Sequence, residues 1–237
     1  MENEFIKKLK NKFSEKNIFL SEEQANKFYV YYKLLKEWNE KINLTAIIEE
    51  DDVIEKHFLD SVISFNKIKD EAKVIDIGSG AGFPGIPLKI LKEGINITLV
   101  DSVNKKVIFL NEVIKILGLK GVSAIHSRIE DLACKPEYRE NFDFVVSRAV
   151  SRLNVLCEYS LPFLKINGNM IAYKSIDAQN EIEEAKNAIK VLGGRFIELV
   201  NIPFKDMERN LVIIKKIEQT NKKYPRSGNK PRLNPII

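Results

Sequence analysis

In residues 1–70, apolar side chains recur at the spacing of an α-helix. Ser21 and Gln24 fit a capping box that would start a helix. Apolar residues then recur every three or four positions in two runs, at Phe28, Tyr32, Leu35 and Trp38 and at Ile54, Phe58, Val62 and Phe65. The segment Asn39–Thr45 separates the two runs. The pattern predicts a helical N-terminal extension over residues 1–70, with these side chains packed in a core.

From Lys73 onward, short runs rich in β-branched residues alternate with helical segments. The predicted strands are Lys73–Gly78, Ile97–Ser102, Val122–His126, Phe142–Ser147 and Asn169–Ala172. The predicted helices between them are Pro87–Lys92, Lys105–Leu117, Leu153–Leu164 and Ala178–Leu192. This alternation is typical of right-handed βαβ units. We therefore expect an α/β fold with a doubly wound, mostly parallel sheet.

Two further apolar runs, Phe196–Val200 and Leu211–Ile214, close this region. Only ten residues separate them, which is short for a helical crossover, so we predict an antiparallel pair at the sheet edge. We assign residues 71–219 to the α/β domain. The remaining segment, residues 220–237, carries five basic residues and no acidic one, which defines a basic C-terminal tail.

The composition favours an anionic partner and disfavours a metal site. The chain has 237 residues, a formal net charge of +5 and an isoelectric point near 9.0, a balance typical of proteins that bind nucleic acid. The two cysteines, Cys134 and Cys157, and the two histidines show no metal-binding spacing. No run approaches the roughly 20 apolar residues of a membrane span, and the N-terminus lacks a signal-peptide core. We expect a cytoplasmic monomer with no metal and no membrane partner.

A glycine-rich loop follows the first predicted strand and precedes a helix, where it can seat a ligand against the backbone. The in-frame pattern D-x-G-x-G-x-G is formed by Asp76, Gly78, Gly80 and Gly82. This is the pattern of S-adenosylmethionine enzymes with a doubly wound sheet. The dinucleotide pattern G-x-G-x-x-G is met only out of frame, by Gly80, Gly82 and Gly85, and in the natural frame the ring of Phe83 would crowd the helix. We therefore favour S-adenosylmethionine, with Asp76 near its ammonium group.

Polar side chains at three other strand ends face the same crevice, because ligands of such sheets bind at the carboxyl ends of the strands. Asp101 ends the second strand, 23 residues after Gly78, where a carboxylate accepts hydrogen bonds from ribose hydroxyls. Glu130 follows the third strand and can accept from the exocyclic amine of adenine. Arg148 ends the fourth strand, which makes it a candidate for the reaction centre or, alternatively, a structural tie to a neighbouring loop.

S-adenosylmethionine is a methyl donor, and the residues at the end of the fourth strand limit which atom of a nucleic-acid base could accept the methyl group. Methylation of adenine N6 uses an Asn/Asp-Pro-Pro-aromatic motif there, and this chain lacks it. Methylation of pyrimidine C5 needs a cysteine nucleophile, but Cys157 lies among apolar residues of a predicted helix and Cys134 in a polar connection. An atom with an available lone pair, such as guanine N7, fits better, because it needs positioning rather than a general base.

These motifs resemble those of the bacterial 16S ribosomal RNA guanine-N7 methyltransferase family, also called glucose-inhibited division protein B. The resemblance covers nearly the whole chain and also rests on Trp38-Asn39, Asn43-Leu44-Thr45, His57–Ser61, Lys105-Lys106 and Tyr224-Pro225-Arg226. It implies a class I S-adenosylmethionine-dependent methyltransferase fold and a guanine in the decoding-region loop of small-subunit RNA as the target. The implied cofactor contacts are Gly78, Phe83, Asp101, Ser102, Ile129, Glu130 and Arg148.

Basic residues near these strand ends and in the tail are candidates for an RNA-facing surface. The predicted set is Lys105, Lys106, Arg128, Arg209, Lys222, Lys223 and Arg226. A nicotinamide-dependent oxidoreductase and an RNA-binding module with a vestigial cofactor site remain as alternatives, which the frame and completeness of the glycine pattern disfavour. His57, Asp60 and Ser61 share one face of a predicted helix, but no nucleophile elbow accompanies them. We interpret this trio as polar packing between the N-terminal helices and the glycine loop.

Overall fold

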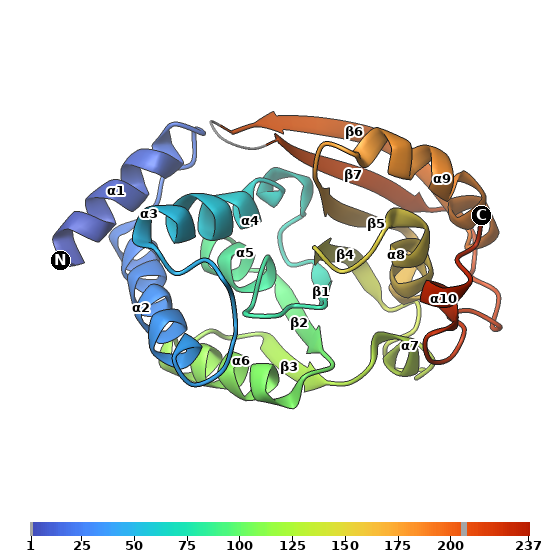
Figure 1. The fold of residues 1–237 in the computed structure, drawn as a ribbon, viewed down its shortest axis with the longest axis horizontal. Helices are drawn as coiled ribbons and strands as arrows, with labels where there is room; N and C mark the ends of the chain where they lie inside the picture. Colours follow the sequence, from blue (N-terminus) through green and yellow to red (C-terminus); the bar gives the residue numbers. More distant parts are fainter. Residues whose placement is uncertain (1, 205–207) are drawn as a thin grey trace.

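A seven-stranded sheet forms the centre of the molecule, with strand order β3-β2-β1-β4-β5-β7-β6 (Figure 1). The computed structural model describes residues 2–204 and 208–237. From β3 to β5 along this order the strands run parallel, whereas β7 is antiparallel to β5 and β6 is antiparallel to β7. The prediction of a mostly parallel sheet with an antiparallel edge is confirmed. The strands are β1 (Lys73–Ile77), β2 (Asn96–Asp101), β3 (Val122–His126), β4 (Phe142–Arg148), β5 (Leu164–Lys174), β6 (Gly194–Pro203) and β7 (Glu208–Lys216).

Helices cover both faces of this sheet and bury two apolar layers against it. Successive residues of a strand point to opposite faces, so Val74 belongs to one buried apolar layer and its neighbour Ile75 to the other. The helices within and after the sheet are α5 (Gly85–Leu91), α6 (Asn104–Ile116), α7 (Ile129–Leu132), α8 (Leu153–Ser160), a 3₁₀ turn (Leu161–Phe163), α9 (Ala178–Val191) and α10 (Lys230–Leu233). Gly118 follows α6 with a φ of +61°, as expected for a glycine that ends a helix.

The N-terminal extension is helical, but its second predicted helix is interrupted. Its elements are α1 (Glu2–Ser14), α2 (Glu22–Asn39), α3 (Glu50–Asp52), a π-helical turn (Val53–Leu59), α4 (Asp60–Val62) and a 3₁₀ turn (Phe65–Lys67). The capping box of Ser21 and Gln24 is present at the start of α2. Phe28 and Phe58 are fully buried and pack on each other, as predicted, whereas Trp38 is only half-buried. The π-helical turn could not be anticipated from apolar spacing, and such turns concentrate at functional sites.

The order of the strands reverses beside β1, which has β2 on one side and β4 on the other. In a doubly wound sheet this reversal opens a crevice at the carboxyl ends of the strands. The glycine loop leaves β1 at that point. Among the described residues, no helix is apolar and long enough to cross a lipid bilayer. Within the same part of the chain, no cluster of three or more His, Cys, Asp or Glu side chains is arranged to hold a metal ion.

Candidate functional site

The glycine loop turns sharply after β1, and its glycines are required by the backbone. Gly78, Gly80 and Gly82 have φ values of +70°, +59° and +98°, a region that other residues rarely adopt. The backbone N–H of Gly78 donates to the carbonyl of Val100 at 2.9 Å, which ties the loop to β2. A Cβ on Gly82 would lie 2.6 Å from the hydroxyl oxygen of Tyr31. The loop is therefore fixed between β2 and α2.

Asp76 lies beneath this loop and is fully buried. Its Oδ2 accepts a hydrogen bond from the backbone N–H of Gly85 at 2.9 Å, whereas its Oδ1 has no partner among the described residues. Burial raises the pKa of Asp76 to about 7. An unpaired buried carboxylate oxygen is costly, so this atom is suited to a cationic or donor group of a ligand.

Gly85 lies outside the D-x-G-x-G-x-G pattern, but the packing of α5 against the sheet depends on it. A Cβ at Gly85 would lie 2.3 Å from Cδ2 of Leu99 and 2.7 Å from Oδ2 of Asp76. This glycine thus permits the close approach of α5 to the sheet. Phe83 does not stand at this point of close approach, and its ring stacks on the imidazole of His57, with 4.4 Å between ring centroids.

Asp101 ends β2 and fixes the loop from the opposite side. Its Oδ2 accepts from the backbone N–H of Gly80 at 2.9 Å, and its Oδ1 accepts from that of Val103 at 2.9 Å. Each carboxylate oxygen can accept a second hydrogen bond. Asp101 is almost buried and lines the pocket described next.

A pocket of about 320 Å³ opens beside Asp101, within the usual range of small-molecule sites, about 300–1,000 Å³. Its lining includes five predicted cofactor residues and one predicted RNA residue, Gly78, Asp101, Ser102, Ile129, Glu130 and Arg128. The sequence interpretation missed its other lining residues, Val100, Val150, Tyr159, Asn229 and Arg232. The other predicted cofactor residues, Asp76, Gly80, Gly82, Phe83 and Arg148, lie outside this lining. The pocket thus unites the ends of β2 and β3 with two segments from much later in the chain.

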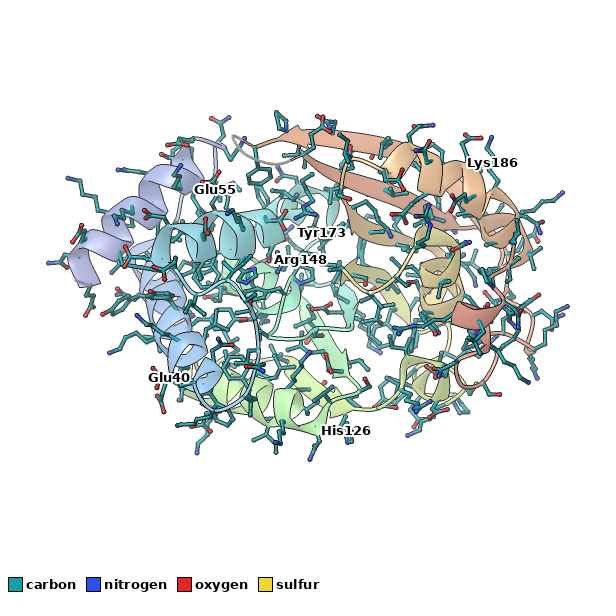
Figure 2. All side chains as sticks on the ribbon, viewed as in Figure 1. Glu40, Glu55, His126, Arg148, Tyr173 and Lys186 are labelled. Carbon is teal, nitrogen blue, oxygen red and sulfur yellow. The ribbon has the colours of Figure 1, made fainter. Side chains whose placement is uncertain are left out.

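Arg148 lies at the carboxyl end of β4, near the centre of the molecule and beside Tyr173 of β5 (Figure 2). Its Nη1 donates to Oδ2 of Asp60 at 2.8 Å and to the carbonyl of Lys56 at 3.0 Å. The guanidinium carbon also lies 5.0 Å from the centre of the Phe83 ring, within the range of a cation–π contact. Arg148 therefore connects the end of β4 to both the π-helical turn and the glycine loop.

Asp60 joins a second arginine to the first. Nε of Arg209 lies 2.6 Å from Oδ1 of Asp60, and Nη2 lies 2.9 Å from Oδ2. Asp60 is fully buried and the two arginine side chains are 11% and 18% exposed, so the three charges form one shielded cluster. Arg209, predicted to face RNA, and Arg148, predicted to contact the cofactor, thus meet on one carboxylate.

His57 is held as a neutral imidazole in the same cluster. Nη2 of Arg148 lies 3.1 Å from its Nδ1, and because arginine only donates, the imidazole proton belongs on Nε2. That nitrogen lies 2.8 Å from Oγ1 of Thr45. Burial, together with the charge of Arg148, lowers the pKa of His57 to about 3. His57 therefore serves as polar packing between the N-terminal helices and the glycine loop, as the sequence suggested, and extends that packing to β4.

The predicted RNA residues differ in exposure and in pairing, and among the exposed ones Nη1 of Arg128 lies 3.8 Å from Oε1 of Glu130. Lys105 and Lys106 lie in the first turn of α6, and Lys105, Arg128, Lys222 and Lys223 are exposed. Arg226 instead pairs with the buried carboxylate of Glu158, with 2.6 Å between Nη2 and Oε2. The ion pairs of Arg209 with Asp60 and of Arg226 with Glu158 could not be predicted, because the two partners of each pair are distant in the sequence.

We predict that Asp60→Ala lowers stability strongly, because it removes the buried carboxylate that both shielded guanidinium groups bind. Removing one partner of a buried ion pair costs about 3–5 kcal/mol, which corresponds to a fall of about 6–20 °C in melting temperature for a chain of this size. Asp52→Ala is the matched control, since Asp52 is 47% exposed and pairs with Lys56 at the surface. Calorimetric melting that shows equal, small shifts for both variants would contradict a structural role for Asp60.

Most of the sequence matches one family of known proteins. The family model GidB, described as rRNA small subunit methyltransferase G, matches residues 24–212. A relative named Ribosomal RNA small subunit methyltransferase G from Desulforamulus reducens is 50% identical over 232 residues, which cover 96% of this chain and 97% of the relative. A protein of the same name from Clostridium kluyveri is 48% identical over 218 residues, covering 91% and 92%.

Solved structures of low sequence identity share the fold. The crystal structure of TYW2 from M. jannaschii in complex with AdoMet has 20% identity and a TM-score of 0.57, and covers 73% of this chain and 80% of that chain. A SAM-dependent methyltransferase from Aquifex aeolicus has 17% identity and a TM-score of 0.55, with coverage of 76% and 98%. These likenesses support the class I methyltransferase fold. Because the family model and the relatives match most of its length, the chain belongs to the GidB family of rRNA small subunit methyltransferase G proteins.

Proposed function

We propose that this protein methylates N7 of a guanine in the 16S RNA of the small ribosomal subunit, with S-adenosylmethionine as methyl donor. The observation that carries the proposal is the pocket at the strand-order reversal, lined by Gly78, Asp101 and Glu130 in a member of the GidB family. Since its substrate is ribosomal RNA, we place its activity in the cytoplasm, and we propose that it acts as a monomer. We propose three parts of the chain: a helical extension (residues 1–70), a catalytic domain (residues 71–219) and a basic tail (residues 220–237).

The residues present fit this cofactor. Asp101 would accept hydrogen bonds from the ribose hydroxyls and Glu130 from the adenine amine, with Ser102, Ile129 and Phe83 contributing further contacts. The unpaired Oδ1 of Asp76 would face the ammonium group. Above Gly80 the space is open, because the nearest atom to a Cβ built there is 4.0 Å away, and Gly78 and Gly82 shape the rest of the loop. When bound, S-adenosylmethionine supplies a methyl group on a positively charged sulfur.

The side chains around the site favour a target atom that needs no deprotonation. His57 is neutral and both of its nitrogens are engaged. Burial raises the pKa of the Cys157 thiol to about 12, so this residue does not supply the thiolate that pyrimidine methylation requires. Guanine N7 presents a free lone pair, so the protein's work is to orient the base and exclude water. We propose that Arg148 takes part in this orientation.

We propose that five basic side chains contact RNA phosphates: the exposed Lys105, Arg128, Lys222 and Lys223, and the partly buried Lys106. Arg128 and Lys105 belong to segments that follow β3 and β2, next to the pocket. Arg209 and Arg226 are retained as RNA candidates, although their guanidinium groups already bind Asp60 and Glu158. For these two we propose a mixed role, in which the ion pair fixes the orientation of the guanidinium group at the RNA-facing surface.

Transfer of a labelled methyl group tests the function directly. Ribosomal RNA and small subunits from a bacterial strain lacking this enzyme are incubated with the protein and labelled S-adenosylmethionine, and the modified nucleotide is mapped. We expect one labelled guanine in 16S RNA, blocked at N7. Binding of NAD in preference to S-adenosylmethionine, or label on another base or on carbon, would refute the proposal.

We predict that cofactor affinity depends on pH through Asp76. Its pKa of about 7 means that below this pH a proton must leave before the carboxylate can pair with an ammonium group. The affinity for S-adenosylhomocysteine should therefore increase as pH rises through 7, and below it should fall by up to about tenfold per pH unit. Calorimetric titration between about pH 5.5 and 8 measures the effect, and Asp76→Asn should remove it. A pH-independent wild-type affinity would place the ammonium elsewhere.

We predict that Arg148→Ala reduces the single-turnover methylation rate about 100-fold by misplacing the reactants. The fold should survive, because Asp60 keeps its pairing with Arg209. Arg148→Lys should rescue the rate poorly, since lysine lacks the planar fork that reaches Lys56, His57 and Asp60 together. If melting shows lost stability while the folded fraction retains full activity, Arg148 is a structural residue only.

We predict that RNA binding weakens steeply with salt and that the double variant Lys105→Ala/Lys106→Ala has a shallower slope. Each lost phosphate contact should reduce the slope of log affinity against log salt by about 0.7–0.9. Lys186→Ala on α9 is the control, because Figure 2 places this residue far from Arg148. The slope of the control should match the wild type, and equal slopes for all three proteins would remove α6 from the RNA surface.

A further inference from the structure

The C-terminal tail is built into the fold rather than extended from it. After β7 the chain crosses the α7–α8 side of the molecule, and α10 lies against α8 (Figure 1). The guanidinium of Arg139 donates to the carbonyls of Thr220 at 2.7 Å and Tyr224 at 2.9 Å. The amide of Asn187 donates to the carbonyl of Ile237 at 2.7 Å. These bonds hold the tail at both of its ends.

A buried carboxylate anchors the middle of the tail. Glu158 on α8 is 1% exposed, and its Oε1 accepts from the backbone N–H of Arg226 at 2.8 Å and from Nε at 2.9 Å. Its Oε2 accepts from Nη2 of Arg226 at 2.6 Å. Leaving such a charge unpaired would be costly, so this contact fixes the path of the chain immediately before α10.

That path brings two donor side chains to the pocket. Asn229 and Arg232 line it together with Asp101 and with Tyr159 of α8. Burial and the neighbouring charge of Glu130 raise the pKa of Tyr159, while the charge of Arg232 opposes the rise. Lys230 and Leu233 belong to the same short helix but are not among the lining residues.

The strand-end residues and the tail residues of the pocket lining have complementary chemistry. The strand ends offer the carboxylates of Asp101 and Glu130, which only accept hydrogen bonds when ionised. An adenosine group also presents ring nitrogens, which are acceptors and need donors. The guanidinium of Arg232 only donates, and the amide of Asn229 can do both. Neither residue belongs to the strand-end motifs that define the rest of the site.

We propose that the C-terminal tail forms the outer wall of the cofactor pocket, with Asn229 and Arg232 as specificity-determining contacts to the adenosine part of the cofactor. The inference rests on the proposed function and extends it from the sheet to a segment that the glycine-loop motif does not include. Arg226, through Glu158, acts as a positioning residue for this wall.

The test compares two ligands that share adenosine and differ in the amino-acid part, S-adenosylhomocysteine and 5′-methylthioadenosine. Calorimetry measures the dissociation constants for the wild type, Arg232→Ala and Lys230→Ala. Loss of a charge-assisted contact in Arg232→Ala should raise both constants about tenfold or more. Lys230→Ala removes the same charge from the same helix outside the pocket, so both constants should stay within about twofold.

A second variant, deletion of residues 229–237, removes the wall but keeps the Arg226 anchor. It should stay folded, because the contacts of Arg226 with Glu158 and of Arg139 with the tail backbone remain, and it should raise both constants at least as much as Arg232→Ala. If the wild type binds neither ligand, the proposed function itself fails. If it binds both and Arg232→Ala binds equally well, the tail is no part of the pocket. If only S-adenosylhomocysteine weakens, Arg232 contacts the amino-acid part, and the adenosine assignment is wrong.

Discussion

The shared carboxylate of Asp60 is the interaction on which the site depends. It is fully buried and receives guanidinium groups from the end of β4 and from β7, so one buried charge joins three segments that are distant in sequence. The π-helical turn just before it adds the carbonyl of Lys56 and the imidazole of His57 to the same arginine. The N-terminal helices therefore cannot shift without displacing Arg148.

The same helices also shape the glycine loop. The hydroxyl of Tyr31 on α2 donates to the carbonyl of Ala81 within the loop, and the imidazole of His57 stacks on Phe83. On the opposite side, Asp101 holds the backbone of Gly80. The loop is consequently preorganised from two directions, which reduces the entropy that a ligand must overcome on binding. The N-terminal extension is part of the construction of the site rather than an appendage to it.

Sequence reasoning succeeded where the signal is local. The strand–glycine–helix transition at Asp76–Gly85 and the acidic residues Asp101 and Glu130 follow from short motifs at strand ends, and all of these lie in or beside the pocket. It failed where two residues meet across the fold. Asp60 and Arg209 are 149 positions apart, and Glu158 and Arg226 are 68 apart. No periodicity encodes such pairs, so two arginines predicted only as RNA contacts proved to be bound to buried carboxylates.

The electrostatics of Asp60 have a consequence for methyl transfer. A methylating site of this type handles a cationic donor and yields a cationic N7-methylguanine, so an unscreened guanidinium nearby would repel both. By sharing its charge with Arg148 and Arg209 in a shielded cluster, Asp60 reduces the positive field at the end of β4 while preserving the directional N–H donors of the arginine. The neutral state of His57 avoids adding a further positive charge. The cluster thus keeps the N–H donors of Arg148 in fixed directions and weakens the repulsion between its positive charge and the cationic donor and product. This suits a reaction that depends on positioning rather than on proton transfer.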